Sequence, residues 1–498
     1  MLKYLYTLYR RLTTGGSTEE QAIQSGIWMV GINVGDRVLQ ILKIIILARL
    51  LSPKAFGLLG IALLAIASLR QFSELGFNQA LIQNEKENVD ALLNTAWVIK
   101  IARGLIVAAI AVVAAPTLAN LFGEPEAAPL IRYIGFTPLI LGLQNPAVIY
   151  FQKNLNFHRE FVYLVGGRLV DLVVAVVIAL FYGDVWALAA GLIAMNIIKF
   201  LLSYIIHEYR PSVEFELKHG KEMFGFGKWI FASAILVFLY SQGDDVFVGW
   251  YFTAASLGFY QIAYRFSNAP ATEVTQIISR VAFPAFSQVQ NDIQRLRQGY
   301  FRAVQLSTMV AFPMSVGIAV VAPQFVHVAL GDQWDPVVPL MQVLAIWGGL
   351  RAFGANIGPV FKSVGKPDIE VKIQALKVLV IIITIFPAAE NLGVVGVAAT
   401  IVGSSFITLP VALYFVLSII EAEAMELLRL VFYPLTGSFG MGAIVFAVDM
   451  YLFNTFGLLQ LIVLIALGGI VYTLLMLAIE SKTSCEFSEL YILFRQTI

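Results

Sequence analysis

The chain has 498 residues, of which 59% are hydrophobic and only 13% are charged, and its net charge at pH 7 is +1. Soluble domains carry roughly 25% charged residues, so this composition, with a mean hydropathy of +0.81, predicts an all-α integral membrane protein. The near-neutral charge excludes a nucleic-acid-binding protein. The single Cys485 excludes a disulfide framework, and the four scattered histidines lead us to expect no metal and no cofactor.

Residues 1–24 predict a cytoplasmic interfacial segment rather than a cleavable signal peptide. Apolar positions alternate there with the basic residues Lys3, Arg10 and Arg11. Such a pattern is typical of a helix that lies in the membrane surface.

The remaining chain is a series of apolar runs separated by short polar breaks. Because a spanning helix needs about 20 apolar residues, we predict fourteen transmembrane helices, at residues 25–48, 56–82, 95–116, 130–151, 165–182, 185–206, 229–250, 257–284, 302–322, 338–360, 372–388, 394–417, 430–450 and 458–479. Lysine and arginine concentrate in one set of breaks, whereas the other set holds only Arg49, Lys54 and Arg132. The positive-inside rule therefore places the N- and C-termini in the cytoplasm.

An internal repeat divides the chain into two lobes. Phe56-Gly57 recurs 201 residues later as Leu257-Gly258, and Gly26 and Trp28 recur as Gly227 and Trp229. We predict an N-lobe of six helices at 25–206, a cytoplasmic linker at 207–228 and a C-lobe of six helices at 229–417. Two added helices at 418–480 and a cytoplasmic tail at 481–498 follow. Parallel repeats of this kind place a substrate site between them, around a central cavity.

Polar side chains follow one face of the first two helices of each repeat. In the first helix they fall within an arc of roughly 120°, and they are Asn33, Asp36, Arg37, Gln40 and Lys43. The second helix carries Arg70, Glu74 and Asn78, and the eighth carries Gln261, Tyr264, Arg265 and Asn268. An unpaired charge in hydrocarbon costs at least a few kcal/mol, so these faces must meet protein or a water-filled cavity.

Arginine dominates these faces, and its planar guanidinium suits a phosphate or pyrophosphate head group that bears sugars. The candidate substrate-binding residues are Arg37, Arg70, Arg265, Arg351, Asn33, Gln40, Asn78, Gln261, Tyr264 and Asn268. Arg37 is the strongest candidate, and Asp36 is expected to be the partner that holds it. The candidates for ion coupling are Asp36, Glu74 and Asp244, and no metal site is expected.

Structural interpretations stand beside these functional ones. The pairs Asp36/Arg37 and Arg70/Glu74 could simply hold helices together. Cations near the span ends could extend to the membrane surface, and these are Lys43, Arg103, Arg168, Lys199 and Arg280. Asp449 lies outside the repeat and is interpreted as a helix-end residue.

Three segments carry a family resemblance. Residues 48–57 (ARLLSPKAFG), residues 74–82 (ELGFNQALI) and residues 183–191 (GDVWALAAG) resemble the polysaccharide-transport (PST) family of the multidrug/oligosaccharidyl-lipid/polysaccharide flippase superfamily. The resemblance extends over most of the chain. It implies a lipopolysaccharide, O-antigen or exopolysaccharide flippase that moves a polyprenyl-diphosphate-linked oligosaccharide from the cytoplasmic to the outer leaflet by alternating access. The motifs are mainly structural, so no functional residue is transferred from them.

Two other functions are considered. A cation-coupled drug or small-molecule antiporter of the same superfamily would favour an acidic cavity, whereas arginine dominates here. A membrane glycosyltransferase or ligase would need a sizeable extramembrane domain, for which the external breaks are too short, or acidic and histidine residues in an external loop. Only His327, Asp332 and Asp335 hint at such residues. We therefore expect a monomeric, non-enzymatic transporter of the cell (plasma or inner) membrane, with membrane lipids and polysaccharide-assembly proteins as its partners.

Overall fold

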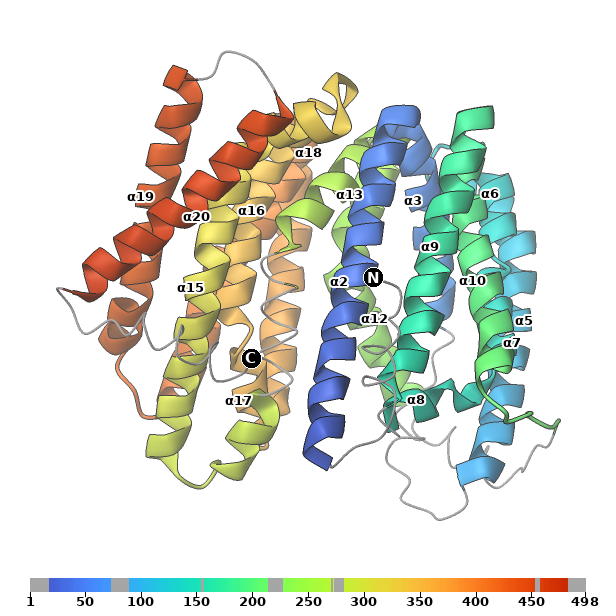
Figure 1. Cartoon of the computed structure of the whole chain (residues 1–498), viewed down its shortest axis with the longest axis horizontal. Helices are drawn as coiled ribbons and strands as arrows, with labels where there is room; N and C mark the ends of the chain where they lie inside the picture. The colour runs from blue at the N-terminus through green and yellow to red at the C-terminus, as the bar shows by residue number, and fades with distance from the viewer. Residues whose placement is uncertain are drawn as a thin grey trace, which may run out of the picture. The chain divides into compact units, whose positions relative to one another are not determined.

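The computed structural model describes residues 18–72, 89–153, 156–213, 227–269, 272, 282–452 and 457–481. Over these ranges the chain is almost entirely helical and has no β-strand, which confirms the all-α prediction (Figure 1). Nine of the helices described are long and apolar enough to cross a membrane. The total of fourteen spans stays a prediction.

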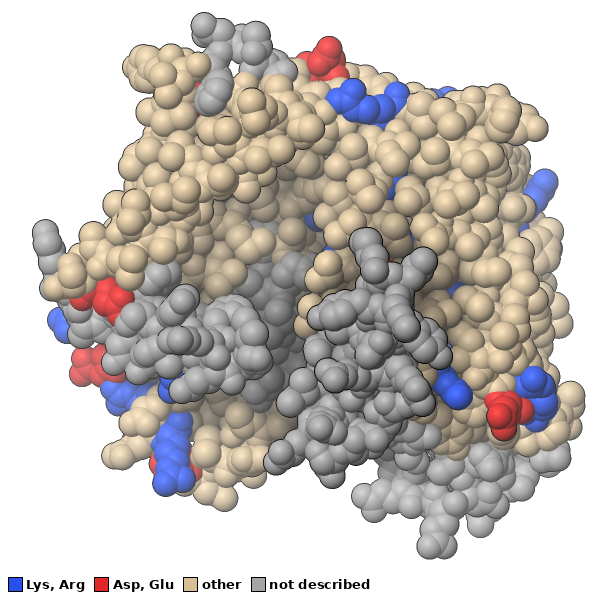
Figure 2. All heavy atoms as spheres, viewed as in Figure 1, with Lys and Arg blue, Asp and Glu red and all other residues tan. Residues whose placement is uncertain are grey.

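The surface of the described residues suits a lipid environment. On the face shown in Figure 2, acidic and basic side chains are few and are separated by broad uncharged areas. Large apolar side chains are widely exposed, and examples are Phe181 at 81%, Ile205 at 76% and Tyr451 at 79%. In a multi-pass membrane protein, lipid chains cover such side chains and no water needs to be excluded from them.

The chain divides into two compact units, the first ending at Gly258 and the second beginning at Phe259. Helix α12 (Gly227–Tyr251) packs against α3 (Pro53–Phe72) and therefore belongs to the first unit. The lobes predicted at 25–206 and 229–417 stay predictions. Much of the predicted N-terminal segment, linker and tail lies outside the described residues, namely 1–17, 214–226 and 482–498.

Unit 1 is a bundle whose breaks are set by proline and glycine. It contains α2 (Thr18–Leu50), α3, α5 (Val89–Leu121), α6 (Ala127–Ile134), α7 (Thr137–Leu143), η1 (Pro146–Val148), α8 (Ile149–Lys153), α9 (Phe157–Tyr182), α10 (Trp186–Ile206) and α12. Pro53 separates α2 from α3, because its ring fixes φ for a first helical position and disfavours a helical residue before it. Gly183 ends α9 in the left-handed region at φ +61°, and its N–H donates to the carbonyl of Ala179.

The single span predicted over 130–151 is instead a series of short helices. Asn145 is extended, and its side chain accepts a hydrogen bond from the N–H of Ala147 at 3.0 Å. Pro146 follows directly, and a proline restricts the residue before it to extended conformations. The apolar run is therefore long enough for one span, but the backbone is interrupted within it.

Within unit 1, the repeat-related glycines lie in a reciprocal contact. A Cβ atom on Gly57 would stand 1.6 Å from the carbonyl oxygen of Ala254, and one on Gly258 would stand 2.3 Å from that of Pro53. Ala254 follows Pro53, and Gly258 follows Gly57, by the same 201 residues. The glycine of each repeat thus contacts the helix start of the other repeat, at equivalent positions, as in a contact across a local two-fold axis. Only glycine permits this approach of two helix starts.

Unit 2 contains the rest of α13 (Ala254–Ser267), which begins in unit 1, followed by α15 (Ile293–Phe325), η2 (Val326–Leu330), η3 (Asp332–Trp334), α16 (Val337–Gly354), α17 (Ile357–Ser363), α18 (Pro367–Ile419), α19 (Ala424–Leu452) and α20 (Leu458–Glu480). Asp292 caps α15, because its carboxylate accepts the N–H of Arg295 at 3.1 Å. Gly393, at φ +61°, breaks α18 between the predicted spans 372–388 and 394–417. Helices α15, α19 and α20 share an apolar core that includes Met309, Val445 and Leu464.

Candidate substrate site

In unit 1, buried and half-buried charges join α2 to α9. Asp36 accepts hydrogen bonds from Arg168, with Nε to Oδ1 at 2.8 Å and Nη2 to Oδ2 at 3.4 Å. The Nη1 atom of Arg168 also lies 3.5 Å from Oδ2 of Asp171. The other oxygen of Asp171 forms an ion pair with Lys43. Two acids and two bases thus compensate one another around Asp171, whose side chain is only 1% exposed.

Small residues make room for this cluster. A Cβ on Gly191 of α10 would stand 2.7 Å from Oδ1 of Asp171, and a Cβ on Gly35 of α2 would touch Val165 of α9 at 3.4 Å. Lys199 of α10 lies across Gly167, and its ammonium is 5.8 Å from the centre of the Tyr163 ring. The glycines therefore let three helices pack closely around the charges.

The predicted pairing of Asp36 with Arg37 was wrong. Adjacent helical residues point about 100° apart, so Asp36 faces α9 while Arg37 lies on another side of α2. There, Arg37 donates to Oε1 of Gln40 at 3.1 Å. Arg168 and Lys43 do not simply extend to the membrane surface, because both pair with acids. Asn33 is exposed.

The structure describes only some of the other site residues predicted for unit 1. Arg70 is exposed at the end of α3, and its carbonyl accepts a hydrogen bond from Arg103 at 2.7 Å. Glu74 and Asn78 lie outside the described residues. Asp244 is buried on α12 at 7% exposure.

In unit 2, the structure brings three predicted residues together around an indole ring. Arg351 donates from Nη1 to Oδ1 of Asn268 at 3.1 Å, and its guanidinium carbon is 5.1 Å from the centre of the Trp347 ring. The Tyr264 ring lies beside the same indole, with ring centres 5.1 Å apart. The ammonium of Lys377 is 5.7 Å from that indole. Two cations and two aromatic rings thus converge.

The partners of Arg351 in this cluster are electrically neutral. Within the described part of the chain, its interactions are with the Asn268 amide and the Trp347 ring, and no carboxylate pairs with it. Asn268 is 7% exposed, whereas Arg351 itself is exposed. Lys377 donates to the hydroxyl of Ser405 at 3.1 Å. An amide and a ring hold the guanidinium in place without neutralising its charge.

The sequence interpretation missed Trp347 and Lys377. Lys377 lies within the predicted span 372–388, in an apolar run with Leu376, Val378 and Leu379, but it was not among the candidates. A lone lysine within such a run is the signal that could have identified it. Of the remaining candidates on α13, Gln261 is half-buried and Arg265 is exposed.

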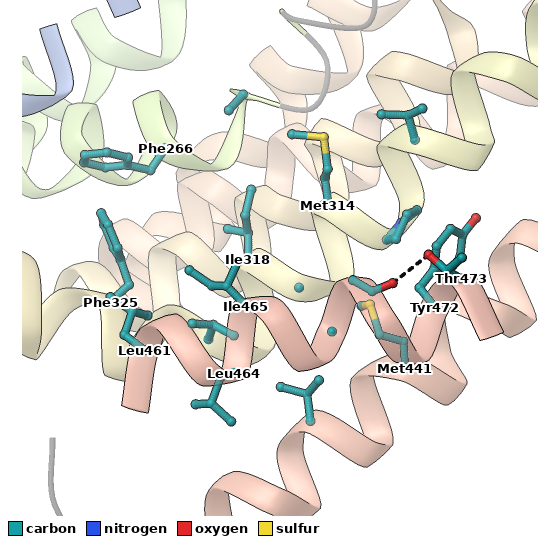
Figure 3. A pocket seen from close by; sticks show the side chains of 18 of the residues that line it. Phe266, Met314, Ile318, Phe325, Met441, Leu461, Leu464, Ile465, Tyr472 and Thr473 are labelled. Atoms are coloured by element: carbon teal, nitrogen blue, oxygen red, sulfur yellow. Dashed lines mark hydrogen bonds between the residues drawn. The ribbon is translucent and has the colours of Figure 1, made fainter. Parts of the chain in front are cut away.

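An apolar cavity of about 790 Å³ lies in unit 2 among α15, α19 and α20 (Figure 3). Its labelled walls include Phe325 and Ile318 of α15, Met441 of α19, and Leu461 and Leu464 of α20. The Tyr472 hydroxyl donates to the carbonyl of Met309 at 2.9 Å, and the Thr473 hydroxyl donates to that of Gly469 at 2.8 Å. The polar atoms are thus bonded to backbone, and the surface left for a ligand is hydrocarbon.

Helix α13 and the two residues that follow it contribute to both features. Phe266 and Ala269 line the cavity, while Tyr264 and Asn268 belong to the cluster around Trp347. No three His, Cys, Asp or Glu side chains gather as a metal site would require, in the parts of the chain that are described.

A family model described as "Polysaccharide biosynthesis protein" matches residues 46–339, which is more than half of the chain. The chain belongs to this family. Relatives include a lipopolysaccharide biosynthesis protein, WzxC of Escherichia coli, which is 27% identical over 76% of this chain and 78% of its own length. The succinoglycan biosynthesis transport protein ExoT of Rhizobium meliloti is 29% identical over 68% of each chain.

The fold of this family member also resembles solved transporters. The lipid II flippase MurJ, in an inward closed conformation, aligns with a TM-score of 0.70 at 14% identity, over 90% of this chain and 97% of that one. An inward-facing MATE multidrug transporter of the MOP superfamily aligns with a TM-score of 0.63 at 16% identity, over 78% and 94%. The chain therefore shares the fold of these transporters.

Proposed function

We propose that this protein is a flippase that moves a polyprenyl-diphosphate-linked oligosaccharide from the cytoplasmic to the outer leaflet by alternating access of its two lobes. The observation that carries the proposal is Arg351, a cation inside the predicted span 338–360 whose described partners are neutral. The family and the polysaccharide-biosynthesis relatives support the same substrate class.

The cluster around Trp347 supplies what a diphosphate head group requires. Arg351 offers a planar fork of N–H donors and Lys377 a second positive charge, and both suit phosphate oxygens. The hydroxyl of Tyr264 and the amide of Asn268 are donors and acceptors of the kind that sugar hydroxyls use. Recognition would thus combine charge for the diphosphate with hydrogen bonds for the sugar.

The apolar cavity supplies what the lipid requires. A volume of about 790 Å³ lies within the range of roughly 300–1,000 Å³ that is usual for ligand pockets. Its wall is hydrocarbon, so a polyprenyl chain would gain dispersion contacts there without displacing any bound polar group. The added helices α19 and α20 contribute to this wall, which gives them a role outside the repeat.

The remaining features of the proposal follow from the sequence. We place the protein in the cell (plasma or inner) membrane with both termini in the cytoplasm, as the basic residues of the breaks predict. It would act as a monomer, without a catalytic step, and would deliver its product to polysaccharide-assembly proteins.

Reconstitution into liposomes tests this function. A labelled polyprenyl-diphosphate oligosaccharide is added to the membranes, and its transfer between leaflets is measured by accessibility to an external modifying reagent. We expect Arg351→Ala to reduce the transfer rate about tenfold or more, which corresponds to roughly 1.4 kcal/mol.

The matched control is Arg429→Ala, which removes an exposed arginine of α19 in the same unit. It should leave transfer unchanged. The proposal fails if the wild-type protein transfers no labelled lipid, or if Arg351→Ala transfers it at the wild-type rate.

A further inference from the structure

Three breaks between helices meet at one place in unit 1. The starts of α3 and α13 contact each other at Gly57 and Gly258, and the loop between α5 and α6, residues 122–126, contacts both starts. All three breaks belong to the set that holds few basic residues, which the positive-inside rule assigns to the outer side of the membrane. The structure thus brings together segments that the charge pattern places on one side. We call this place the outer junction.

The two helix starts of the outer junction are capped in the same way. Oγ of Ser52 accepts the N–H of Ala55 at 3.4 Å, and Oγ1 of Thr253 accepts the N–H of Ser256 at 3.2 Å. Thr253 follows Ser52, and Ser256 follows Ala55, by the 201 residues of the repeat. Each cap is supplied by a residue of its own repeat. Separation of the two starts would therefore leave both caps intact.

The α5–α6 loop carries two acids, one for each helix start. Oε1 of Glu124 accepts the N–H of Ala254, the first residue of α13, at 3.1 Å. Oε2 of Glu126 lies 2.7 Å from Nζ of Lys54, in the first turn of α3. A carboxylate at a helix N-terminus also meets the positive end of the helix dipole. One loop of the first repeat thus connects the start of its own α3 to the start of α13 in the second repeat.

The loop combines one buried contact with polar contacts that water reaches. Phe122 is buried, and its ring would lie 3.2 Å from a Cβ on Gly249 of α12. Lys54 and Glu126 are 46% and 65% exposed, so water screens their ion pair, and pairs of this kind contribute little to stability. The hydrogen bond from Ala254 to the charged carboxylate of Glu124 is the stronger kind. It is therefore the contact that most favours the closed junction.

We propose that the α5–α6 loop is a latch that keeps the outer side of the transporter closed, with Glu124 as its positioning residue. The inference rests on the proposed function, because alternating access requires the outer ends of the two repeats to separate when the substrate leaves toward the outer leaflet. With the latch closed, the 1.6 Å between a Cβ on Gly57 and the carbonyl oxygen of Ala254 leaves no room even for a methyl group. Release of Ala254 by Glu124 frees the start of α13 to move away.

Reaction of a buried cysteine with a maleimide tests the latch. Cys485→Ser removes the native thiol, and Ala254→Cys introduces one at a position that is 0% exposed. The thiol should react slowly in the purified full chain. Adding Glu124→Ala should raise the reaction rate about tenfold, which corresponds to a shift of roughly 1.4 kcal/mol in the opening equilibrium. Glu124→Gln keeps an oxygen that accepts the N–H of Ala254 and should restore most of the slow rate.

Two controls separate opening of the junction from other effects. Asp332 follows Gly331 as Glu124 follows Gly123, and both glycines have positive φ, +100° and +66°. Asp332 is exposed, and Asp332→Ala should leave the reaction rate unchanged. A second thiol, from Ala179→Cys on α9, is 4% exposed in the wild type and should react equally slowly with and without Glu124→Ala.

If Ala254→Cys does not fold, Ala55→Cys, at 7% exposure, reports from the other helix start. In intact cells, a membrane-impermeant maleimide should reach the junction thiol from outside. The proposal is overturned if Glu124→Ala leaves the reaction rate unchanged, if the thiol on α9 becomes equally reactive, or if the junction is reached only from the cytoplasm. These measurements add no lipid-linked oligosaccharide, so their failure is separate from failure of the flippase proposal.

Discussion

Unit 1 and unit 2 both carry cations within their helices, but they hold them differently. In unit 1, Arg168 and Lys43 are paired with Asp36 and Asp171. In unit 2, Arg351 is held by the amide of Asn268 and the ring of Trp347. The first arrangement uses charge to fasten α2 to α9, whereas the second positions a charge and leaves it able to attract an anion.

The difference separates two kinds of charge within helices that look alike in the sequence. The first helix, with Asp36 and Arg37 at its middle, is the most conspicuous by pattern. In the structure, its charges Asp36 and Lys43 serve packing, because each meets an opposite charge on α9. A buried ion pair is costly to break although it adds little over an apolar pair, so unit 1 should respond to mutation through stability and unit 2 through transport.

The largest expected effect is on unit 1. Asp171→Ala would leave Lys43 and Arg168 without the carboxylate they share, in a site where the Asp171 side chain is 1% exposed. Breaking a buried pair in this way costs about 3–5 kcal/mol, measured as the free energy of unfolding in detergent. The control Asp36→Ala should cost only about 1 kcal/mol, because Asp36 is 32% exposed and Arg168 keeps Asp171. Equal losses for the two variants would contradict this account.

An apolar replacement of the pair should recover stability. Lys43→Met combined with Asp171→Leu removes both charges and keeps much of the volume, and such exchanges are often neutral. We expect the double variant to regain at least half of the unfolding free energy that Asp171→Ala loses. Transport should be measured on the same preparation, and a double variant that is stable but inactive would show that the cluster has a function beyond packing.

Unit 2 can be converted to the arrangement of unit 1. Asn268→Asp changes one atom and places a carboxylate about where the amide oxygen lies, 3.1 Å from Arg351. The new ion pair should neutralise Arg351 and reduce leaflet transfer about tenfold, since roughly 1.4 kcal/mol of anion attraction would be lost. Asn268→Gln keeps the group neutral and is the control. Wild-type transfer in Asn268→Asp would show that the charge of Arg351 does not act on substrate.

The smallest expected effect is a pH dependence of stability in unit 1. His207, just after α10 in unit 1, has its pKa lowered from the usual value, chiefly by burial and then by Arg159. Its Nδ1 atom accepts the N–H of Tyr209 at 3.1 Å, and its ring stacks on Tyr150, so the fold favours the neutral form. This contribution is complete above the unfolded pKa of about 6.5 and is lost as pH falls through the folded pKa.

Thermal unfolding between neutral and acid pH measures this contribution. His207→Phe keeps an aromatic ring but cannot titrate, so its midpoint should fall less than that of the wild type as the pH is lowered. Parallel pH curves for wild type and His207→Phe would refute the assignment.

The sequence by itself determined the membrane class, the family and the positions of most helices. The predicted span 458–479 and the helix Leu458–Glu480 nearly coincide, because the length of an apolar run and its bounding polar residues are local properties. The repeat was also visible as recurring residues. Its physical meaning, the contact of Gly57 with Ala254 and of Gly258 with Pro53, needed the packed chain.

Only the tertiary structure decided which charges meet. Asp36 pairs with Arg168, which is 132 residues away, and not with its neighbour Arg37. Lys377 contacts the ring of Trp347, which lies on a different helix. Periodicity shows that a helix has a polar face, but the partner of that face depends on which distant helix packs against it. The apolar cavity has the same origin, because hydrocarbon side chains on α15, α19 and α20 form a wall only when those helices are assembled.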